Sequence, residues 1–184
     1  MILTEKNIKE NTIKPLIGKP IEIDAKKPKA IGSASYFLKS FTNKSNQTDT
    51  LKVDSKCNFE KYSDGLLLRV NLSNRLFAIP IPKTELNGIE LIRGQENIQP
   101  FFLSPMWILL KLGVSKLYAR YFRFRLSEYS IDQMELKLDT KQHAMEFIAN
   151  GYIFERQKSF FESLHYGEKL VTREKPVANN TYSK

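Results

Sequence analysis

The chain has 184 residues, 41% of them hydrophobic and 27% charged, which is an ordinary balance for a globular protein. This length predicts one domain with extra terminal segments and a core that needs no disulfide or metal to hold it. The 29 lysines and arginines outnumber the 20 acidic residues, so the net charge is +9. Such a surplus favours anionic partners, namely phospholipid headgroups, nucleic acid or an acidic protein face, although general solubility explains it equally well.

Cysteine content and hydropathy exclude several classes of protein. Cys57 is the only cysteine, which excludes an intramolecular disulfide and a cysteine-rich zinc site. The N-terminus has no apolar run of the kind found in secretory signals. The best candidate for a membrane span, Phe101 to Val114, is shorter than the roughly 18 residues required and contains Lys111. We therefore expect a cytoplasmic protein, with attachment to a membrane face left open.

The first half of the chain reads as short strands separated by turns. Residues 1–19 predict a short helix or arm ending near Pro15, and Pro20 begins a short edge strand. Ala25–Lys29 and Asn43–Thr50 are expected to be loops, and Ser63-Asp64-Gly65 is a hairpin turn. Short apolar segments predict strands at residues 36–41, 58–62, 66–72, 76–81, 88–94 and 133–138.

The segment from Phe101 to Leu126, FFLSPMWILLKLGVSKLYARYFRFRL, interrupts this series. Ser104 is a good N-cap, Pro105 suits the first helical position and Gly113 suits the position after a helix, so Pro105 to Leu112 is predicted as a helix. Alternating side chains then predict a strand from Lys116 to Leu126.

The C-terminal third predicts helices. Asp139 and Gln142 have the spacing of a capping box, and apolar residues follow at helical spacing as far as Gly151. A second helix is predicted from about Phe154 to Tyr166, and residues 168–184 are expected to be a frayed polar tail. We therefore divide the chain into an N-terminal extension at 1–50, a PH-like β domain with its helix at 51–153, and a C-terminal helix and tail at 154–184.

The order of these elements resembles the bacterial PH-like and GRAM-like families over about residues 55–150. The likeness is carried by Asp64-Gly65 with an apolar strand, by Leu76-Phe-Ala-Ile-Pro-Ile-Pro, and by Glu85 to Leu91. It implies a mainly β (α+β) fold, a small antiparallel barrel or sandwich of six to seven strands with a C-terminal capping helix. It also implies a scaffold that binds lipid headgroups or proteins and has no catalytic residues, although a fold alone does not fix function.

Metal and catalytic sites find little support in the sequence. Asp139, His143 and Glu146 share a face of the predicted helix, but a capping role for Asp139 and solvated positions for the other two explain them better. Glu162 and His165 form one Glu-x-x-His pair, whereas a di-metal carboxylate site requires two. No phosphate-binding glycine loop and no hydrolase motif occurs, so we expect no enzyme activity, no cofactor and no metal.

The basic and aromatic segment is the remaining candidate for a binding site. Tryptophan favours the membrane interface, and lysine and arginine there interact with phosphates. In the alternative interpretation, the predicted helix covers an open end of the barrel, and the arginines are exposed or pair with Glu85, Glu90 or Glu128. The residues predicted to bind an anionic surface or a partner are Trp107, Lys111, Lys116, Arg120, Arg123 and Arg125.

Three functions remain open at this point. The first is a non-enzymatic module that docks on an anionic membrane through this segment. The second is a protein-interaction or assembly module in which the segment is buried against a partner or a second copy. The third and least favoured is binding of nucleic acid, by stacking on a strand face that contains Tyr121, Arg123 and Arg125.

Overall fold

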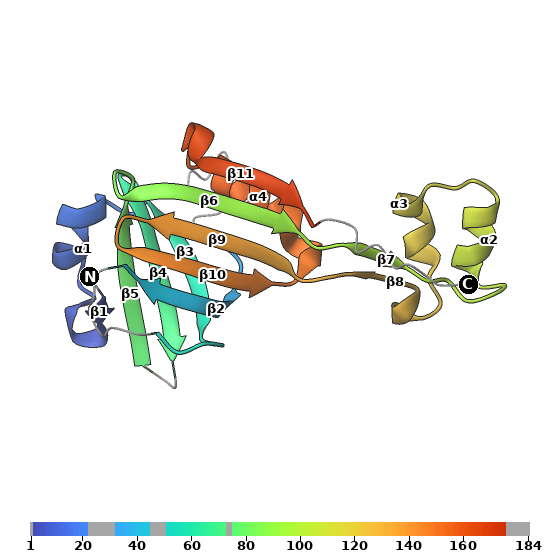
Figure 1. Ribbon diagram of the computed structural model, residues 1–184, viewed down its shortest axis with the longest axis horizontal. Helices are drawn as coiled ribbons and strands as arrows, with labels where there is room; N and C mark the ends of the chain where they lie inside the picture. Colours follow the sequence, from blue (N-terminus) through green and yellow to red (C-terminus); the bar gives the residue numbers. More distant parts are fainter. Residues whose placement is uncertain (1, 22–31, 45–50, 73–74, 176–184) are drawn as a thin grey trace.

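The overall shape is elongated, with a large sheet and a smaller projection at one end (Figure 1). The structure, a computed structural model, describes residues 2–21, 32–44, 51–72 and 75–175. The loop predicted at residues 25–29 and most of the loop predicted at 43–50 lie outside these ranges.

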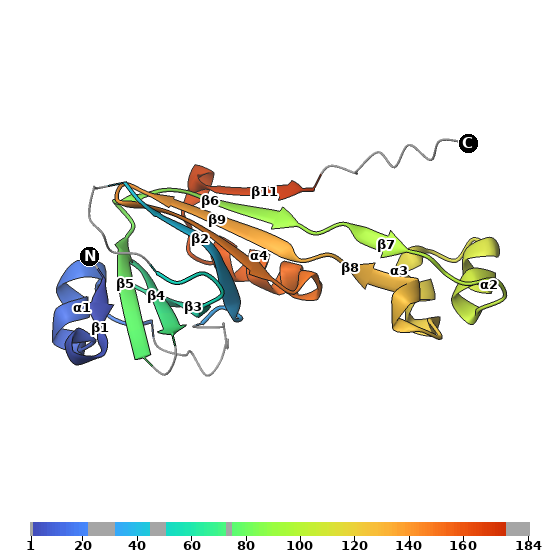
Figure 2. The same ribbon diagram turned by 60° about the horizontal axis from the view of Figure 1, so that its bottom comes forward.

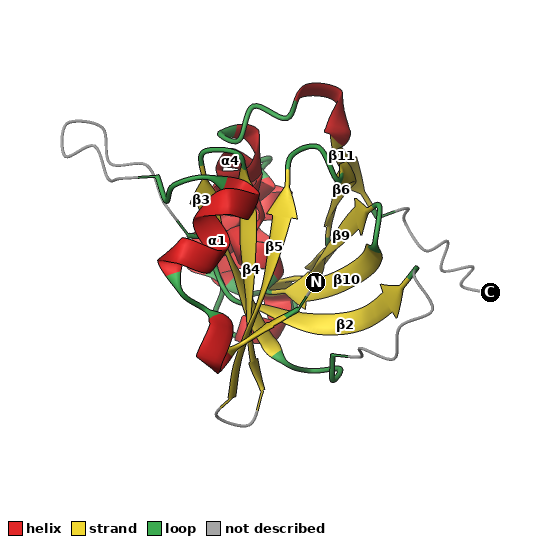
Figure 3. Cartoon of the chain, turned by 90° about the vertical axis from the view of Figure 1, so that its left-hand side faces the viewer, coloured by secondary structure: helices red, strands yellow, loops and turns green. Residues whose placement is uncertain are grey.

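In the described ranges, nine strands form one mixed sheet in the order β1-β5-β4-β3-β2-β10-β9-β6-β11. They are β1 (Leu3–Thr4), β2 (Tyr36–Asn43), β3 (Lys56–Tyr62), β4 (Gly65–Leu72), β5 (Arg75–Pro82), β6 (Leu86–Arg93), β9 (Met134–Thr140), β10 (His143–Ala149) and β11 (Leu170–Glu174). Figure 3 shows this sheet curled into an open trough. The edge strands β1 and β11 do not pair with each other within the described chain. The mainly β class is therefore confirmed, but no closed barrel forms.

The main core lies between the concave face of the sheet and helix α4 (Phe154–Glu162). Phe59 of β3 packs edge-on against Phe147 of β10 and Phe161 of α4, with ring centroids 5.3 and 5.8 Å apart. Along β2 to β6, β9 and β10, the alternation of side chains directs one set of residues into this core. The helix predicted from Phe154 is thus confirmed, and it ends at Glu162, earlier than expected.

Helix α1 (Glu10–Ile17) lies on the other face of the sheet, beside β4 and β5 (Figure 3). Its residues Ile13 and Ile17 are buried with Leu67 and Ala78 in a second, smaller core. The predicted N-terminal helix therefore exists, and it continues two residues past Pro15. Short 3-10 turns also occur at Glu5–Asn7, Gly151–Ile153 and Gly167–Lys169.

The helix predicted to begin at Asp139 is wrong, because this segment is the hairpin between β9 and β10. The Thr140 hydroxyl accepts a hydrogen bond from the backbone N–H of His143 at 2.8 Å. Polar side chains that accept from a nearby backbone N–H group occur both at helix N-termini and in tight turns, so the sequence pattern fits either structure. Here the hydroxyl closes the turn of a hairpin. The following residues alternate between buried and half-buried positions from His143 to Ala149, which is the period of a strand.

The polar tail predicted from residue 168 is also wrong for its first part. Residues Leu170–Glu174 form β11, which pairs in parallel with β6. Most of its side chains are exposed, so it has no apolar pattern that would reveal a strand. Two ion pairs join it and the residue that follows to the sheet: Arg173 with Glu90 at 3.2 Å, and Lys175 with Glu135 at 2.8 Å.

The projection grows out of the sheet as a narrow two-stranded ribbon of β7 (Glu96–Ile98) and β8 (Tyr129–Ile131) (Figures 1 and 2). It ends in two short helices, α2 (Pro105–Lys111) and α3 (Lys116–Ala119). We call residues 96–131 the distal module. None of the described helices is long and apolar enough to cross a membrane.

The neck between sheet and distal module is closely packed. A Cβ atom added to Gly94 would lie 2.0 Å from the backbone oxygen of Asp132, and one added to Gly151 would lie equally close to the same oxygen. Only glycine allows backbones to approach in this way. Three backbone segments therefore meet at one point where the module joins the sheet.

The strand predicted from Lys116 to Leu126 is wrong. Its residues form α3, a 3-10 turn at Arg120–Phe122, an extended stretch and a second 3-10 turn at Leu126–Glu128. The ribbon strand opposite β7 is supplied by Tyr129–Ile131 instead. The alternation in 116–126 misled because both of its sets of side chains are largely exposed, so the pattern does not mark a buried face.

Candidate functional site

The distal module has a small core of its own. Met106 of α2, Ala119 of α3 and Tyr129 of β8 are buried against one another. Partly buried residues surround them, namely Ile98, Leu109, Leu110, Val114 and Ile131. This core joins the two helices to the ribbon, and it leaves most of the large side chains of the module outside.

Helix α2 forms as its sequence predicts. The Ser104 hydroxyl accepts a hydrogen bond from the backbone N–H of Trp107 at 3.1 Å, and Pro105 occupies the first turn. Gly113, just beyond the helix, has a φ of +80°, a conformation that glycine adopts without strain. The sequence therefore defines this helix, although not what it covers.

A buried carboxylate holds the loops of the module together. Glu128 is 1% exposed, and it accepts hydrogen bonds from the backbone N–H groups of Phe124 and Arg125. Burial acts to raise the pKa of Glu128, but the Ser104 hydroxyl and these backbone N–H groups outweigh it, so the pKa lies below its ordinary value. The second oxygen, Oε1, has no hydrogen bond of normal geometry in the described chain. Glu128 thus links the start of α2 to the backbone of residues 124–125 through hydrogen bonds.

Exposed apolar side chains concentrate in this module. Of the 17 large hydrophobic residues that are exposed in the described chain, 11 lie between residues 101 and 126. They are Phe101, Phe102, Leu103, Ile108, Leu112, Leu117, Tyr118, Tyr121, Phe122, Phe124 and Leu126. Exposed apolar patches of this kind are typical of surfaces that bind a partner or a membrane, so the module is the candidate binding surface of the described chain.

Part of this surface consists of two pairs of rings in contact. Phe101 contacts Phe124 with centroids 6.1 Å apart, and Phe102 contacts Trp107 at 5.1 Å. Trp107 is half-buried by this contact. We call Phe101, Phe102, Leu103, Trp107 and Phe124 the aromatic patch. It lies in the module, far from the main sheet (Figure 1), so the interpretation of α2 as a lid over the barrel is wrong.

The turn that presents the aromatic patch has an unusual backbone. The Ser104 N–H donates to the Phe101 carbonyl at 3.1 Å, which closes a four-residue turn. Leu103, the third residue of the turn, has a φ of +63°. Leucine in this left-handed region is strained by roughly 1–2 kcal/mol, and glycine or asparagine is usual there. An exposed leucine therefore occupies a turn position that glycine or asparagine would occupy with less strain.

Five basic residues accompany these apolar ones, and the structure separates them into groups. Lys111 lies over the Trp107 ring at 5.7 Å, and Arg125 lies over the Phe101 ring at 5.1 Å, so both flank the aromatic patch. Lys116 is exposed at the start of α3. Arg120 and Arg123 are half-buried and turn toward the neck, where they line a cavity.

The charges of the module are not balanced by acids. Glu128 is the one acidic residue between positions 97 and 131, and its carboxylate is buried. The five basic side chains make no ion pair with any described residue. The pairing predicted with Glu85, Glu90 or Glu128 is therefore absent from the described chain. Glu90 instead pairs with Lys137 and Arg173 of the main sheet.

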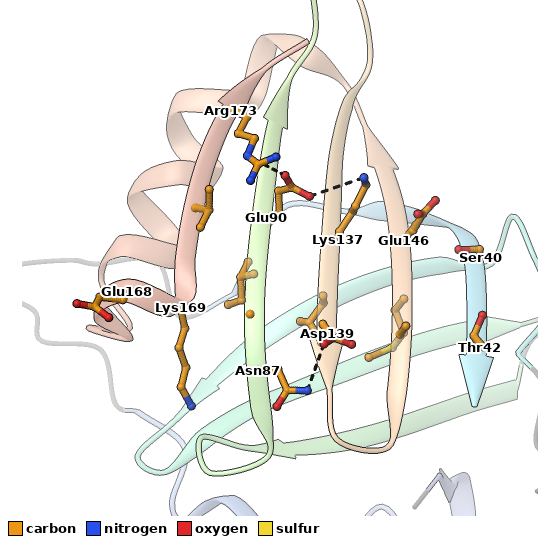
Figure 4. A pocket seen from close by; sticks show the side chains of 16 residues that line it. Ser40, Thr42, Asn87, Glu90, Lys137, Asp139, Glu146, Glu168, Lys169 and Arg173 are labelled. Carbon is orange, nitrogen blue, oxygen red and sulfur yellow. Dashed lines mark hydrogen bonds and ion pairs between the residues drawn. The ribbon is translucent and has the colours of Figure 1, made fainter. Parts of the chain in front are cut away.

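A second hollow, of about 560 Å³, lies on the open face of the main sheet (Figure 4). Glu90 lies between Lys137 and Arg173 and pairs with both, and Asp139 accepts a hydrogen bond from Asn87. Exposed ion pairs of this kind join neighbouring strands and contribute little each. Glu90, Lys137, Asp139 and Arg173 already have partners within the described chain, so these groups give no indication of a particular ligand.

Metal and nucleophile candidates are dispersed. Asp139 points to Lys44 and Asn87, and Glu146 pairs with Lys39, while His143 is buried. Within the described chain, no three acidic, histidine or cysteine side chains gather in a way that suits a metal ion.

The single thiol is also unsuited to chemistry. Burial raises the pKa of Cys57 to about 12, which keeps it protonated at neutral pH.

Comparison with protein-family models, with curated proteins and with solved structures finds no significant match to this chain. The function must therefore be argued from the side chains themselves.

Proposed function

We propose that the chain is a non-enzymatic binding module that docks on an anionic phospholipid surface through the aromatic patch. The observation that carries this is the coincidence, in one projecting module, of exposed aromatic and aliphatic side chains with cations that form no ion pair with an acid of the described ranges. A scaffold of the PH-like kind remains part of this proposal, supported by a mainly β sheet with a helix packed on it.

The chemistry of the patch suits the boundary between headgroups and acyl chains. The rings of Phe102 and Phe124 and the side chain of Leu103 would enter the apolar layer, where burying one such side chain gains roughly 1.5–3 kcal/mol. Trp107 would sit at the headgroup level. Lys111 and Arg125, beside these rings, would meet lipid phosphates at about 1 kcal/mol each.

Self-association through the same surface is less well supported. Two copies would bring together two modules that each contain five basic residues and two acids, of which Glu128 is buried and Glu96 pairs with Arg93 of the main sheet. Like charges facing each other oppose such an interface. An acidic protein partner remains the alternative, and it would show as binding that does not require lipid.

Vesicle co-sedimentation tests the proposal, with phosphatidylcholine vesicles compared with vesicles that also contain phosphatidylserine. We expect binding to the anionic vesicles and a blue shift of Trp107 emission, since this is the only tryptophan of the chain. Replacing Phe102 and Phe124 by serine should abolish both.

The matched control replaces Phe37 and Val53, which are also exposed but lie on the main sheet side, by serine. This variant should bind as the parent does. Equal failure of the parent to bind either kind of vesicle would end the proposal, and so would equal losses in the two variants.

A further inference from the structure

The neck encloses a cavity of about 430 Å³ between the distal module and the sheet. Its lining comes from both sides of the neck. The module contributes Arg120, Tyr121, Arg123, Tyr129 and Ile131, and the main body contributes Arg93, Gly151, Tyr152, Phe154 and Glu155. The volume is in the range of sites for small ligands.

Three guanidinium groups converge on this cavity, and two of them have no carboxylate partner in the described chain. Arg120 donates to the hydroxyl groups of Tyr129 and Tyr121, each at 3.3 Å. Arg123 donates to the backbone carbonyl of Tyr129 at 3.5 Å. These neutral oxygens hold the arginines in position without neutralising their charge.

The third guanidinium, that of Arg93, is shared among carboxylates. It pairs with Glu96 at 3.2 Å, with Glu155 at 3.5 Å and with Glu174 at 4.0 Å, and the last two carboxylates are largely exposed. Its plane also lies over the Phe154 ring at 5.7 Å. An anion in the cavity would therefore replace the weakly held Glu155 as a partner of Arg93 and would be the first charged partner of the other two arginines.

We propose that this cavity binds a phosphate group between Arg93, Arg120 and Arg123. Arginine is suited to this because its planar fork donates two parallel hydrogen bonds to phosphate oxygens. The hydroxyls of Tyr121 and Tyr129 accept from Arg120 and can still donate their own protons to a ligand, and Ile131 and Phe154 provide apolar walls for the rest of it. The phosphate belongs either to a small soluble molecule or to a lipid headgroup.

Occupation of the cavity also has a mechanical consequence. Because Arg120 and Arg123 belong to the module and Arg93 to the end of β6, one phosphate would connect the two sides of the neck. A ligand that contacts both sides favours the arrangement in which they are close. Binding would thus fix the direction in which the module projects.

This site is independent of docking by the aromatic patch, since the two share no residue. Calorimetric titration with pyrophosphate at physiological ionic strength tests it without any membrane. We expect saturable binding of one pyrophosphate per chain. The double variant Arg120→Gln with Arg123→Gln should bind at least tenfold more weakly, since a hydrogen bond to a charged group contributes roughly tenfold in affinity.

Two further variants separate the site from a general effect of charge. Lys6→Gln with Lys14→Gln removes the same charge at the opposite end of the molecule and should leave the affinity unchanged. Glu155→Gln removes the carboxylate partner of Arg93 that lines the cavity and should strengthen binding by roughly two- to fivefold, which a variant that merely failed to fold would not do.

A second experiment identifies the source of the phosphate. It compares binding to vesicles that contain phosphatidic acid with binding to vesicles that contain phosphatidylserine, at equal total charge. A preference for phosphatidic acid that Arg120→Gln with Arg123→Gln removes supports a lipid headgroup. Pyrophosphate binding without this preference supports a soluble ligand. Absence of both, or an equal loss in the Lys6 and Lys14 variant, overturns the site.

Discussion

Leu103 offers a test that separates docking from folding. Replacing it by glycine removes a side chain that is 60% exposed and belongs to none of the buried clusters. It also relieves the strain of a φ of +63°, worth roughly 1–2 kcal/mol. Glycine raises the entropy of the unfolded chain, which costs about 0.4–1 kcal/mol. We therefore expect the free energy of unfolding to stay the same or to rise by up to about 1.5 kcal/mol.

The same substitution should weaken docking. Burying the exposed part of one leucine in the interfacial layer gains roughly 1–2 kcal/mol, so its loss should lower partitioning into anionic vesicles by roughly 5- to 30-fold. Urea denaturation measures the first quantity and vesicle co-sedimentation the second. Val53→Gly is the control: Val53 is 49% exposed but lies outside the module, so vesicle binding should not change. A Leu103→Gly protein that loses stability and still binds vesicles normally would refute the argument.

Two further predictions concern the packing of the module and its neck. Glu128→Gln should loosen the module, seen as a red shift of the tryptophan emission that precedes unfolding of the main sheet. Because hydrogen bonds hold the pKa of Glu128 below its ordinary value of 4.5, the carboxylate stabilises the module above that pH, and acidification below it should reproduce the shift in the parent. An emission spectrum independent of pH down to the acid unfolding of the sheet would contradict this role. Gly94→Ala should cost roughly 1–3 kcal/mol, since its Cβ would meet the Asp132 backbone at 2.0 Å, whereas Gly88→Ala, 3.8 Å from the nearest such atom, should be close to neutral. Equal urea midpoints for the two alanine variants would show that the neck is not tightly packed.

The sequence was sufficient where capping and burial act locally. Helix α2 follows from Ser104, Pro105 and Gly113, because each satisfies or ends a helix by its own backbone chemistry. The hairpin at Ser63-Asp64-Gly65 and the strands around it follow from turn residues between apolar runs. These signals do not depend on what the segment packs against.

Prediction from the sequence failed where one pattern of residues is compatible with two different local structures. From Asp139 onward the residues fit a helix cap, yet the Thr140 hydroxyl closes a hairpin and Met145 and Phe147 alternate into the core. Strand β11 has mainly exposed side chains, and its place depends on the free edge of β6, which no local pattern reveals. Partner strands distant in sequence decide such cases.

All six predicted site residues lie in the distal module. The sequence analysis assigned them to one surface, whereas the structure divides them between the aromatic patch and the neck cavity, with Lys116 exposed at the start of α3. The neck cavity was missed because Arg93, Tyr152 and Glu155 are separated from the 101–126 segment along the chain and reach it only through the fold. A clue existed in the glycines at 94 and 151, since isolated glycines beside strands often mark a close approach of two backbones.

The division of the basic residues has a consequence for how binding must be measured. Lys111 and Arg125 lie over rings of the aromatic patch, so their effect on binding adds to an apolar term that salt does not weaken. Arg120 and Arg123 are half-buried in a cavity, where ions of the solvent screen them less than they screen exposed charges. Loss of binding when any one cation is removed therefore cannot identify the surface that was used. The aromatic patch is identified by substitutions that keep the charge, such as Phe102→Ser with Phe124→Ser. The cavity is identified by Glu155→Gln, which makes the chain more positive at the neck alone.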